Sequence, residues 1–117
     1  MTIDINGAKL EINALNVTEA AAYEEAVKHL GEKVEELQRK GNIGLTECLQ
    51  TQLNIAAEFL DETFGNGAAV AALGENKDLE IALNAVYTVR EAVDAQIEDV
   101  NKKYASKFNS NVVRFSK

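Results

Sequence analysis

Few side chains in this sequence could perform chemistry: it contains one histidine, one cysteine and nineteen carboxylates. His29 lies beside the apolar stripe of a predicted helix. A general base needs a nucleophile or a substrate pocket within hydrogen-bond reach, and no motif supplies one. A nucleophilic pair would have to join His29 to Cys48, with no third residue to orient the histidine. We therefore expect a surface histidine, a small buried cysteine and no enzymatic activity.

The carboxylates and glycines lack the patterns of a metal or phosphate site. Glu91, Asp94 and Glu98 fall at helical spacing, which fits a solvated acidic face better than a weak divalent-cation site. Di-iron bundles need two Glu-x-x-His pairs, and calcium loops need Asp-x-Asp-x-Asp-Gly; neither pattern is present. Gly65-Asn66-Gly67 lacks the Gly-Lys-Ser/Thr ending of a phosphate loop, so it is interpreted as a helix terminator. We expect no metal and no cofactor.

Composition narrows the class of protein further. A chain of 117 residues, 46% apolar and 26% charged, fits one globular domain covering residues 1–117. One cysteine cannot form an internal disulfide framework. The sequence has no apolar run of about 18 residues. Its first residues do not have the basic and apolar pattern of a secretory leader, so we expect none. The net charge of -7 disfavours nucleic acid, because phosphates attract Lys and Arg. We expect a soluble, intracellular protein that binds no nucleic acid, membrane or small-molecule substrate.

Residues 2–12 predict a β-hairpin. Asn6-Gly7 is typical of a type I′ turn, which needs positive φ at both central residues. This turn places six apolar side chains on one face, in three cross-strand pairs: Ile5 with Ala8, Ile3 with Leu10 and Met1 with Ile12. Because an isolated two-stranded hairpin is marginal in water, this face must cover a helix or meet another subunit.

The rest of the chain predicts three main helices and one short one within residues 18–107. Apolar residues repeat at spacings of three and four over about 18–40, 46–64, 68–73 and 79–107. The fold class is therefore mainly α with an N-terminal hairpin (α+β), forming a small helical bundle.

Local signals mark the helix ends. Asn16-x-x-Glu19 resembles a capping box, with Thr18 as the alternative N-cap. Thr46 is expected to cap the second helix, and Asn76 or Asp78 the last. Gly31 interrupts the first helix at a cost of about 1 kcal/mol relative to Ala. We attribute this glycine to close packing of another element.

The last helix and the segment after it predict an interface. A helix of about 30 residues is about 45 Å long, whereas a compact domain of this size is about 35 Å across. Its end must fray or overhang, and its apolar stripe continues to Tyr104 and Phe108. The basic tail, residues 108–117, includes Val112, Val113 and Phe115. That segment could add as an edge strand beside the hairpin.

Charge is divided unevenly between the tail and the rest of the chain. Five of the twelve basic residues lie within residues 102–117, which hold no acid, so residues 1–101 carry seven basic and nineteen acidic side chains, net -12. Helix-dipole complementarity with a solvated tail explains this pattern. The alternative is an arm that docks on an acidic partner, including a second copy of the chain.

One segment resembles a known family. The run from Phe59 to Gly67, Phe-Leu-Asp-Glu-Thr-Phe-Gly-Asn-Gly, is similar to a signature found in small proteins of phages and prophages of Gram-positive bacteria. Those proteins also open with an Ile-Asn-Gly hairpin and end their long helix in Lys-Tyr, as at Lys103-Tyr104. The tail differs, because the family's basic tail contains Pro and this one does not.

The resemblance implies a tail-assembly chaperone, a small acidic helical protein that shields the tape measure protein in the host bacterial cytoplasm. The family has no known catalytic residues. The alternatives are a structural or accessory subunit of the virion, at the tail or head–tail junction, and a DNA-mimicking inhibitor. Self-association is the alternative to a tape-measure partner. The candidate protein-binding residues are Phe59, Phe64, Tyr104, Phe108, Val112, Val113 and Phe115.

Overall fold

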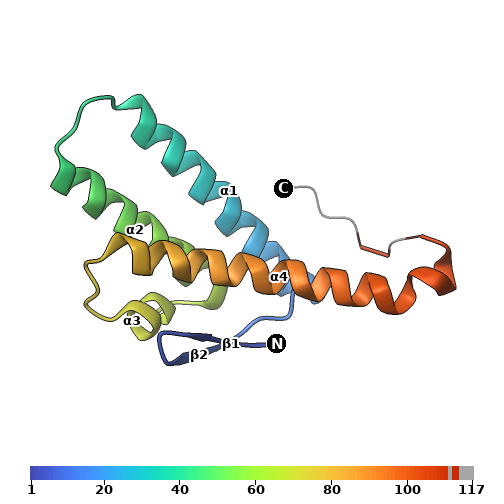
Figure 1. The fold of residues 1–117 in the computed structure, drawn as a ribbon. Coiled ribbons are helices and arrows are strands. Elements are labelled where there is room, and N and C mark those ends of the chain that lie inside the picture. Colours follow the sequence, from blue (N-terminus) through green and yellow to red (C-terminus); the bar gives the residue numbers. More distant parts are fainter. Residues whose placement is uncertain (111, 114–117) are drawn as a thin grey trace.

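An N-terminal hairpin followed by four helices forms the fold (Figure 1). The structure is a computed structural model that describes residues 1–110, 112 and 113. The elements are β1 (Thr2–Ile5), β2 (Ala8–Glu11), α1 (Val17–Arg39), α2 (Leu45–Phe64), α3 (Ala68–Leu73) and α4 (Leu79–Phe108). The predicted fold class, mainly α with an N-terminal hairpin, is confirmed.

The hairpin has the predicted turn and register. Asn6 and Gly7 have φ of 53° and 89°, as a type I′ turn requires, and Ile3 pairs with Leu10. Strand β1 contacts α4 and β2 contacts α3, so Ile3, Ile5 and Ile12 of the apolar face are buried, whereas Met1 is 50% exposed. The Asn6 side chain also donates a hydrogen bond to the Ala72 carbonyl of α3, at 3.1 Å. The turn is thereby attached to the helical layer.

A buried glutamine joins the end of the hairpin to α4. The Gln96 side chain accepts a hydrogen bond from the Ala14 N–H at 2.7 Å and donates one to the Ile12 carbonyl at 2.9 Å. Gln96 is 9% exposed and is the one buried polar residue among those described. The first bond satisfies the Ala14 N–H in the connection to α1, and the second is shared, because the Ile12 carbonyl also accepts a hydrogen bond from the N-terminal amino group at 3.0 Å.

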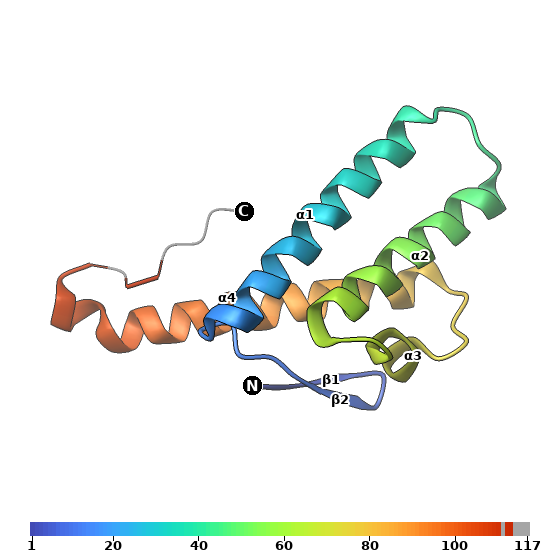
Figure 2. The ribbon, with the colours of Figure 1, turned by 180° about the vertical axis from the view of Figure 1, so that it is seen from behind.

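Helix α2 is the central helix of the bundle, since it contacts α1, α3 and α4. Helices α1 and α2 lie antiparallel, and their connected ends point away from α4 in both views (Figures 1 and 2). The C-terminal half of α4 extends beyond the other elements (Figure 2). The molecule measures 54 × 32 × 21 Å, so the predicted overhang is present and the helix does not fray within it.

Two of the predicted caps are present and one is not. Asn16 accepts hydrogen bonds from the N–H groups of Thr18 and Glu19, and Asp78 caps α4. Glu19 bonds the N–H of Asn13, so the capping box is not reciprocal. The prediction for Thr46 was wrong, because α2 begins at Leu45, directly after the extended Gly44, with no side-chain cap.

The explanation offered for Gly31 was also wrong. A Cβ atom built at Gly31 meets nothing within 4 Å, and the residue is exposed. It lies on the outer face of α1, where no element packs. The glycine is therefore a local weakness of α1 and does not provide a close approach.

We predict that Gly31→Ala raises the free energy of unfolding by about 0.5–1 kcal/mol, because alanine restricts the unfolded chain and fits a helix without strain. Urea denaturation measures the change. The matched control is Gly67→Ala, where φ is +97°; it should lower stability by about 1–2 kcal/mol. A destabilising Gly31→Ala would mean that α1 packs differently.

A second prediction concerns the buried glutamine. Gln96→Met keeps the length of the side chain but removes both hydrogen bonds, leaving the Ala14 N–H without its partner. Stability should fall by about 1–3 kcal/mol, measured by urea denaturation. Gln38→Met, at an exposed position of α1, should change it by less than about 0.5 kcal/mol. Equal effects of the two variants would contradict the role assigned to Gln96.

Candidate functional site

The two phenylalanines of the signature segment lie in or against the core. Phe59 is 2% exposed, and its ring centroid is 6.2 Å from that of Tyr23 on α1. Phe64 is half-buried and packs against the same core. For Phe59 the structure shows core packing, so a partner cannot contact this side chain in the present conformation.

The acidic residues of the same segment hold helices together. Asp61 accepts a hydrogen bond from the Ala69 N–H at 2.9 Å, near the start of α3, and its carbonyl accepts the Gly65 N–H at 2.8 Å. Glu62 Oε2 lies 2.7 Å from His29 Nδ1 on α1. The residues of the signature therefore form the end of α2, hold the start of α3 and attach α2 to α1.

His29 and Cys48 do not form a nucleophilic pair. The His29 ring bridges two carboxylates, because its Nε2 lies 3.5 Å from Glu25 in addition to the contact with Glu62. The Gln52 side chain donates to Cys48 Sγ at 3.3 Å. The prediction that Cys48 is buried was wrong: it is half-buried, since the chain around it belongs to the part of α2 that points away from α4.

The carboxylates of α4 form no metal cluster. In residues 1–110, 112 and 113, no group of three or more His, Cys, Asp or Glu side chains is arranged to hold an ion. Glu98 pairs with Lys102 at 2.9 Å. The hydrogen bond from Lys102 to Glu98, together with the charges of Glu98 and Asp99, raises the pKa of Lys102. This lysine is therefore fully charged at neutral pH.

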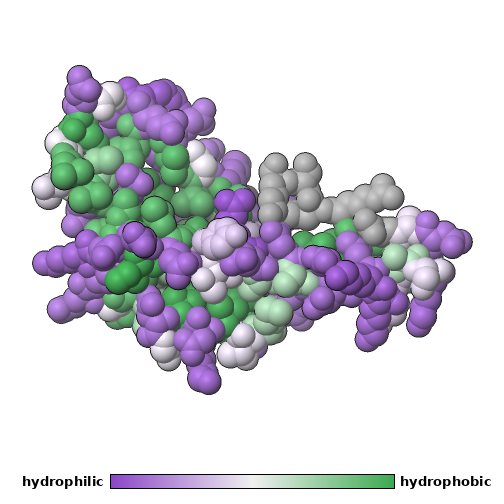
Figure 3. Space-filling view, in the orientation of Figure 1, coloured by the Kyte–Doolittle hydropathy of each residue, from purple (hydrophilic) through white to green (hydrophobic). Residues whose placement is uncertain are grey.

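An apolar groove of about 230 Å³ opens where α1 and α2 diverge from α4. Leu30 and Val34 of α1, Ile55 of α2, and Leu83 and Tyr87 of α4 line it. Leu83 is 48% exposed and Tyr87 60%. Hydrophobic residues gather over this region of the surface (Figure 3). We call this feature the α1–α2–α4 groove.

The groove residues were not among the predicted binding residues. Leu83 and Tyr87 lie four residues apart on α4, outside the apolar stripe that predicts the core. An i, i+4 apolar pair beside a stripe is the signal that could have found them. Whether such a pair lines a groove depends on the angle between α1 and α4, and the spacing of apolar residues in the sequence does not determine that angle.

Four other predicted residues lie at the end of α4. The Nζ atoms of Lys103 and Lys107 each lie 5.4 Å from the ring centroid of Tyr104. Phe108, the last residue of the helix, is 65% exposed. Val112 is 50% exposed and Val113 half-buried. We call residues 103–113, as far as the structure describes them, the α4 tip.

The described part of the tail does not extend the sheet. The Asn101 side chain accepts hydrogen bonds from the N–H groups of Val112 and Val113 and donates one to the Val113 carbonyl. The sheet contains only β1 and β2 among the described residues. Residues 112 and 113 are thus attached to α4, so the edge-strand prediction was wrong for them. Phe115 lies outside the described residues.

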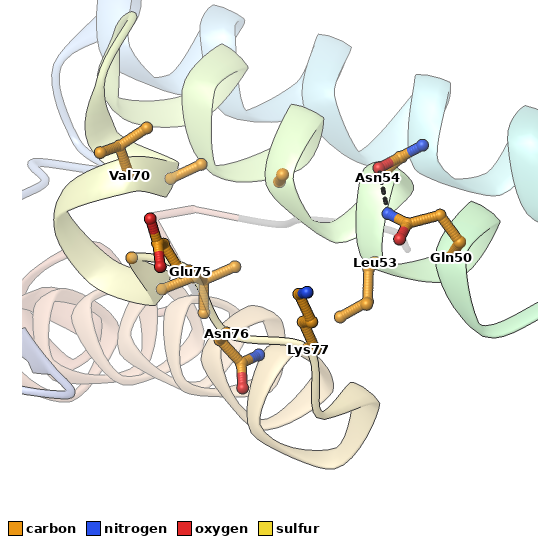
Figure 4. A pocket seen from close by; sticks show the side chains of 11 residues that line it. Gln50, Leu53, Asn54, Val70, Glu75, Asn76 and Lys77 are labelled. Atoms are coloured by element: carbon orange, nitrogen blue, oxygen red, sulfur yellow. Dashed lines mark hydrogen bonds between the residues drawn. The ribbon is translucent and has the colours of Figure 1, made fainter. Parts of the chain in front are cut away.

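A second hollow, of about 520 Å³, lies between α2, α3 and the loop that leads to α4 (Figure 4). Gln50 donates a hydrogen bond to Asn54 at its edge, at 3.0 Å. Its two charged residues, Glu75 and Lys77, are exposed and of opposite sign. This arrangement presents no buried polar group to a ligand, so the apolar groove is the stronger candidate site.

Comparison with known proteins identifies the family of the chain but no individual relative. The chain belongs to a family of unknown function, DUF6673, whose model matches residues 6–114. No curated protein and no solved structure matches it. Within the part of the chain that the structure describes, no helix has the length and hydrophobicity needed to cross a membrane.

The different environments of two phenylalanines lead to a third prediction. Phe59→Ala should lower the free energy of unfolding by about 3–5 kcal/mol, because it opens a cavity in the core. Phe108→Ala should change it by less than about 0.5 kcal/mol, since the side chain is exposed. Chemical denaturation compares the two variants. A large loss for Phe108→Ala would show that the α4 tip is part of the fold.

Proposed function

We propose that the protein is a non-enzymatic assembly factor of the tail-chaperone type, which binds an amphipathic helix of a partner such as the tape measure protein of a phage or prophage. The single observation that carries the proposal is the α1–α2–α4 groove, an open apolar surface on an acidic chain. Helix-binding proteins bind the apolar face of their target in such a groove. The proposed place of action is the host bacterial cytoplasm.

The groove has a closed floor and an exposed rim. Ile55 and Val86, at its floor, are each only 7% exposed. The floor is therefore held in place by core packing before a partner binds. Leu83, Tyr87 and Val34 remain partly exposed at the rim. Covering them would stabilise a complex by about 25 cal/mol for each Å² of apolar surface removed from water. The acidic residues elsewhere on the surface would keep that complex soluble.

The phage part of the proposal is supported by the resemblance of residues 59–67 to the signature of the phage family. In this structure those residues form the α2–α3 connection and its attachment to α1. The resemblance therefore concerns the scaffold that positions α2, one wall of the groove. The groove itself supports the binding of a helical partner.

The fourth prediction tests this function by co-expression with the tape measure protein encoded by the same phage or prophage. The wild-type chain should increase the soluble fraction of that protein and co-purify with it. Leu83→Glu should abolish both effects, because it places a charge in the groove. Ile81→Glu is the matched control: it is on the same helix and 42% exposed but does not line the groove.

Two results would contradict this proposal. A wild-type chain that neither solubilises nor retains the tape measure protein would exclude that partner. Equal losses in Leu83→Glu and Ile81→Glu, with both variants folded by circular dichroism, would show that the groove is not the binding surface.

The overhanging end of α4 favours a second candidate function, a structural or accessory subunit of the virion. Phe108 and Val112 are exposed there at one end of a molecule 54 Å long, as expected of a subunit that joins others through its end. Mass spectrometry of purified particles separates the two functions. A chaperone leaves before the particle is complete, whereas a subunit remains in it.

A further inference from the structure

Helix α4 carries opposite charges along its length. Residues 91–99 contain four acids and no Lys or Arg, whereas residues 102–107 contain three lysines and no acid. An exposed aromatic residue lies at the outer end of each charged stretch: Tyr87 precedes the acidic one and Phe108 follows the basic one. The groove itself is lined by one charged residue, the basic Arg90. The acidic surface therefore begins just beyond the groove, at Glu91, and an aromatic and basic surface lies at the α4 tip.

The tip cannot fill the groove of its own molecule. Tyr87 and Phe108 are 21 residues apart on one continuous helix, which separates them by about 32 Å. The groove lies among α1, α2 and the N-terminal half of α4, whereas the tip extends beyond the other elements (Figure 2). Only the tip of a second copy can reach the groove.

We propose that two copies of the chain form an antiparallel dimer along α4, in which the α4 tip of each copy occupies the α1–α2–α4 groove of the other. Residues 87, 94, 101 and 108 are seven apart, so they follow one side of the helix with a small drift. Pairing Tyr87 with Phe108 of the second copy places residue 91 opposite residue 104 of that copy. The same pairing occurs twice in a two-fold dimer.

Charge selects the antiparallel orientation. In it, Glu91 of one copy lies opposite Tyr104 of the second, and the two lysines that flank this ring, Lys103 and Lys107, meet a carboxylate. A parallel pair would place acid against acid and lysine against lysine. Like charges placed together cost free energy, so the antiparallel dimer is the favoured one.

The attachment of residues 112 and 113 to Asn101 places this short segment on the same side of α4, so that at this level it lies between the two helices of the dimer. Asn101 lies on the side of α4 that carries Tyr87 and Phe108, and its side chain holds the backbone of both valines. Val112 keeps half of its surface exposed. Its apolar side chain therefore extends the patch that Phe108 begins.

The dimer rests on the groove and on the charges of α4, and does not require the proposed function. If both are right, dimer formation covers the groove and a helical partner must displace the tip. The variant Phe108→Asp then separates the two ideas, because it removes dimerisation and leaves the groove open to the tape measure protein.

The experiment is sedimentation equilibrium of the full chain and of two single variants, Tyr87→Asp at the groove and Phe108→Asp at the tip. Both positions are at least 60% exposed, so both variants should fold. Each alone should dimerise about tenfold or more weakly than wild type, since it lacks one partner at both contacts. Val70→Asp, 72% exposed on α3, is the control and should dimerise like wild type.

Mixing the two variants is the decisive step. A heterodimer restores one Tyr87–Phe108 contact, which neither variant can form with itself, while its other contact brings the two substituted positions together. The mixture should therefore associate more tightly than either variant alone. Raising salt from about 0.1 M to about 1 M shortens the screening length from about 10 Å to about 3 Å and should weaken the wild-type dimer.

Three outcomes would overturn the proposal. The wild-type chain could remain monomeric at all concentrations. The variants could dimerise as well as wild type. The mixture could associate no better than either variant alone, which would contradict the pairing of Tyr87 with Phe108.

Discussion

The hydrogen bonds of Gln96 are the interaction on which the arrangement of this molecule most depends. A two-stranded sheet has little stability of its own, and here it must be held against helices that follow it in the chain. Gln96 binds the backbone on both sides of Asn13 and so determines where the hairpin ends on α4. Helix α1 begins at Val17, three residues after Ala14. The position of its first turn beside α4, and the direction in which it leaves, therefore follow from this contact.

The divergence of α1 from α4 is what creates an apolar surface open to solvent. Helix α2 packs on both, and residues such as Phe59 and Leu60 fill the space between them where they are close. Farther along, α1 and α2 continue as a pair and α4 turns away. The His29–Glu62 contact and the Lys33–Glu58 ion pair join α1 to α2, but exposed pairs contribute little. Apolar packing between the two helices keeps them together and leaves Leu83 and Tyr87 uncovered.

The sequence predicts those features that depend on neighbouring residues. Asn6-Gly7 is sufficient for the turn and hence for the register, and the apolar spacings place all four helices within a few residues of their observed bounds. Gly31 was misjudged because a helical glycine has two explanations, close packing or none, and only the three-dimensional surroundings distinguish them. Gln96 and the groove were missed for the same reason. A polar residue in a core position finds its partners 82 and 84 residues away in the chain.

The segment that most resembles another family is also the one whose side chains are most occupied within the fold. Phe59 fills the core, Asp61 holds the start of α3 and Glu62 contacts α1. Such residues can be shared by proteins that need the same scaffold, whatever they bind. The residues free to contact another molecule, such as Leu83, Tyr87 and Phe108, lie on α4 outside the signature. If the chain binds a partner as proposed, the choice of that partner depends on the exposed face and charge pattern of α4, whereas the signature determines the shape of the support beneath it.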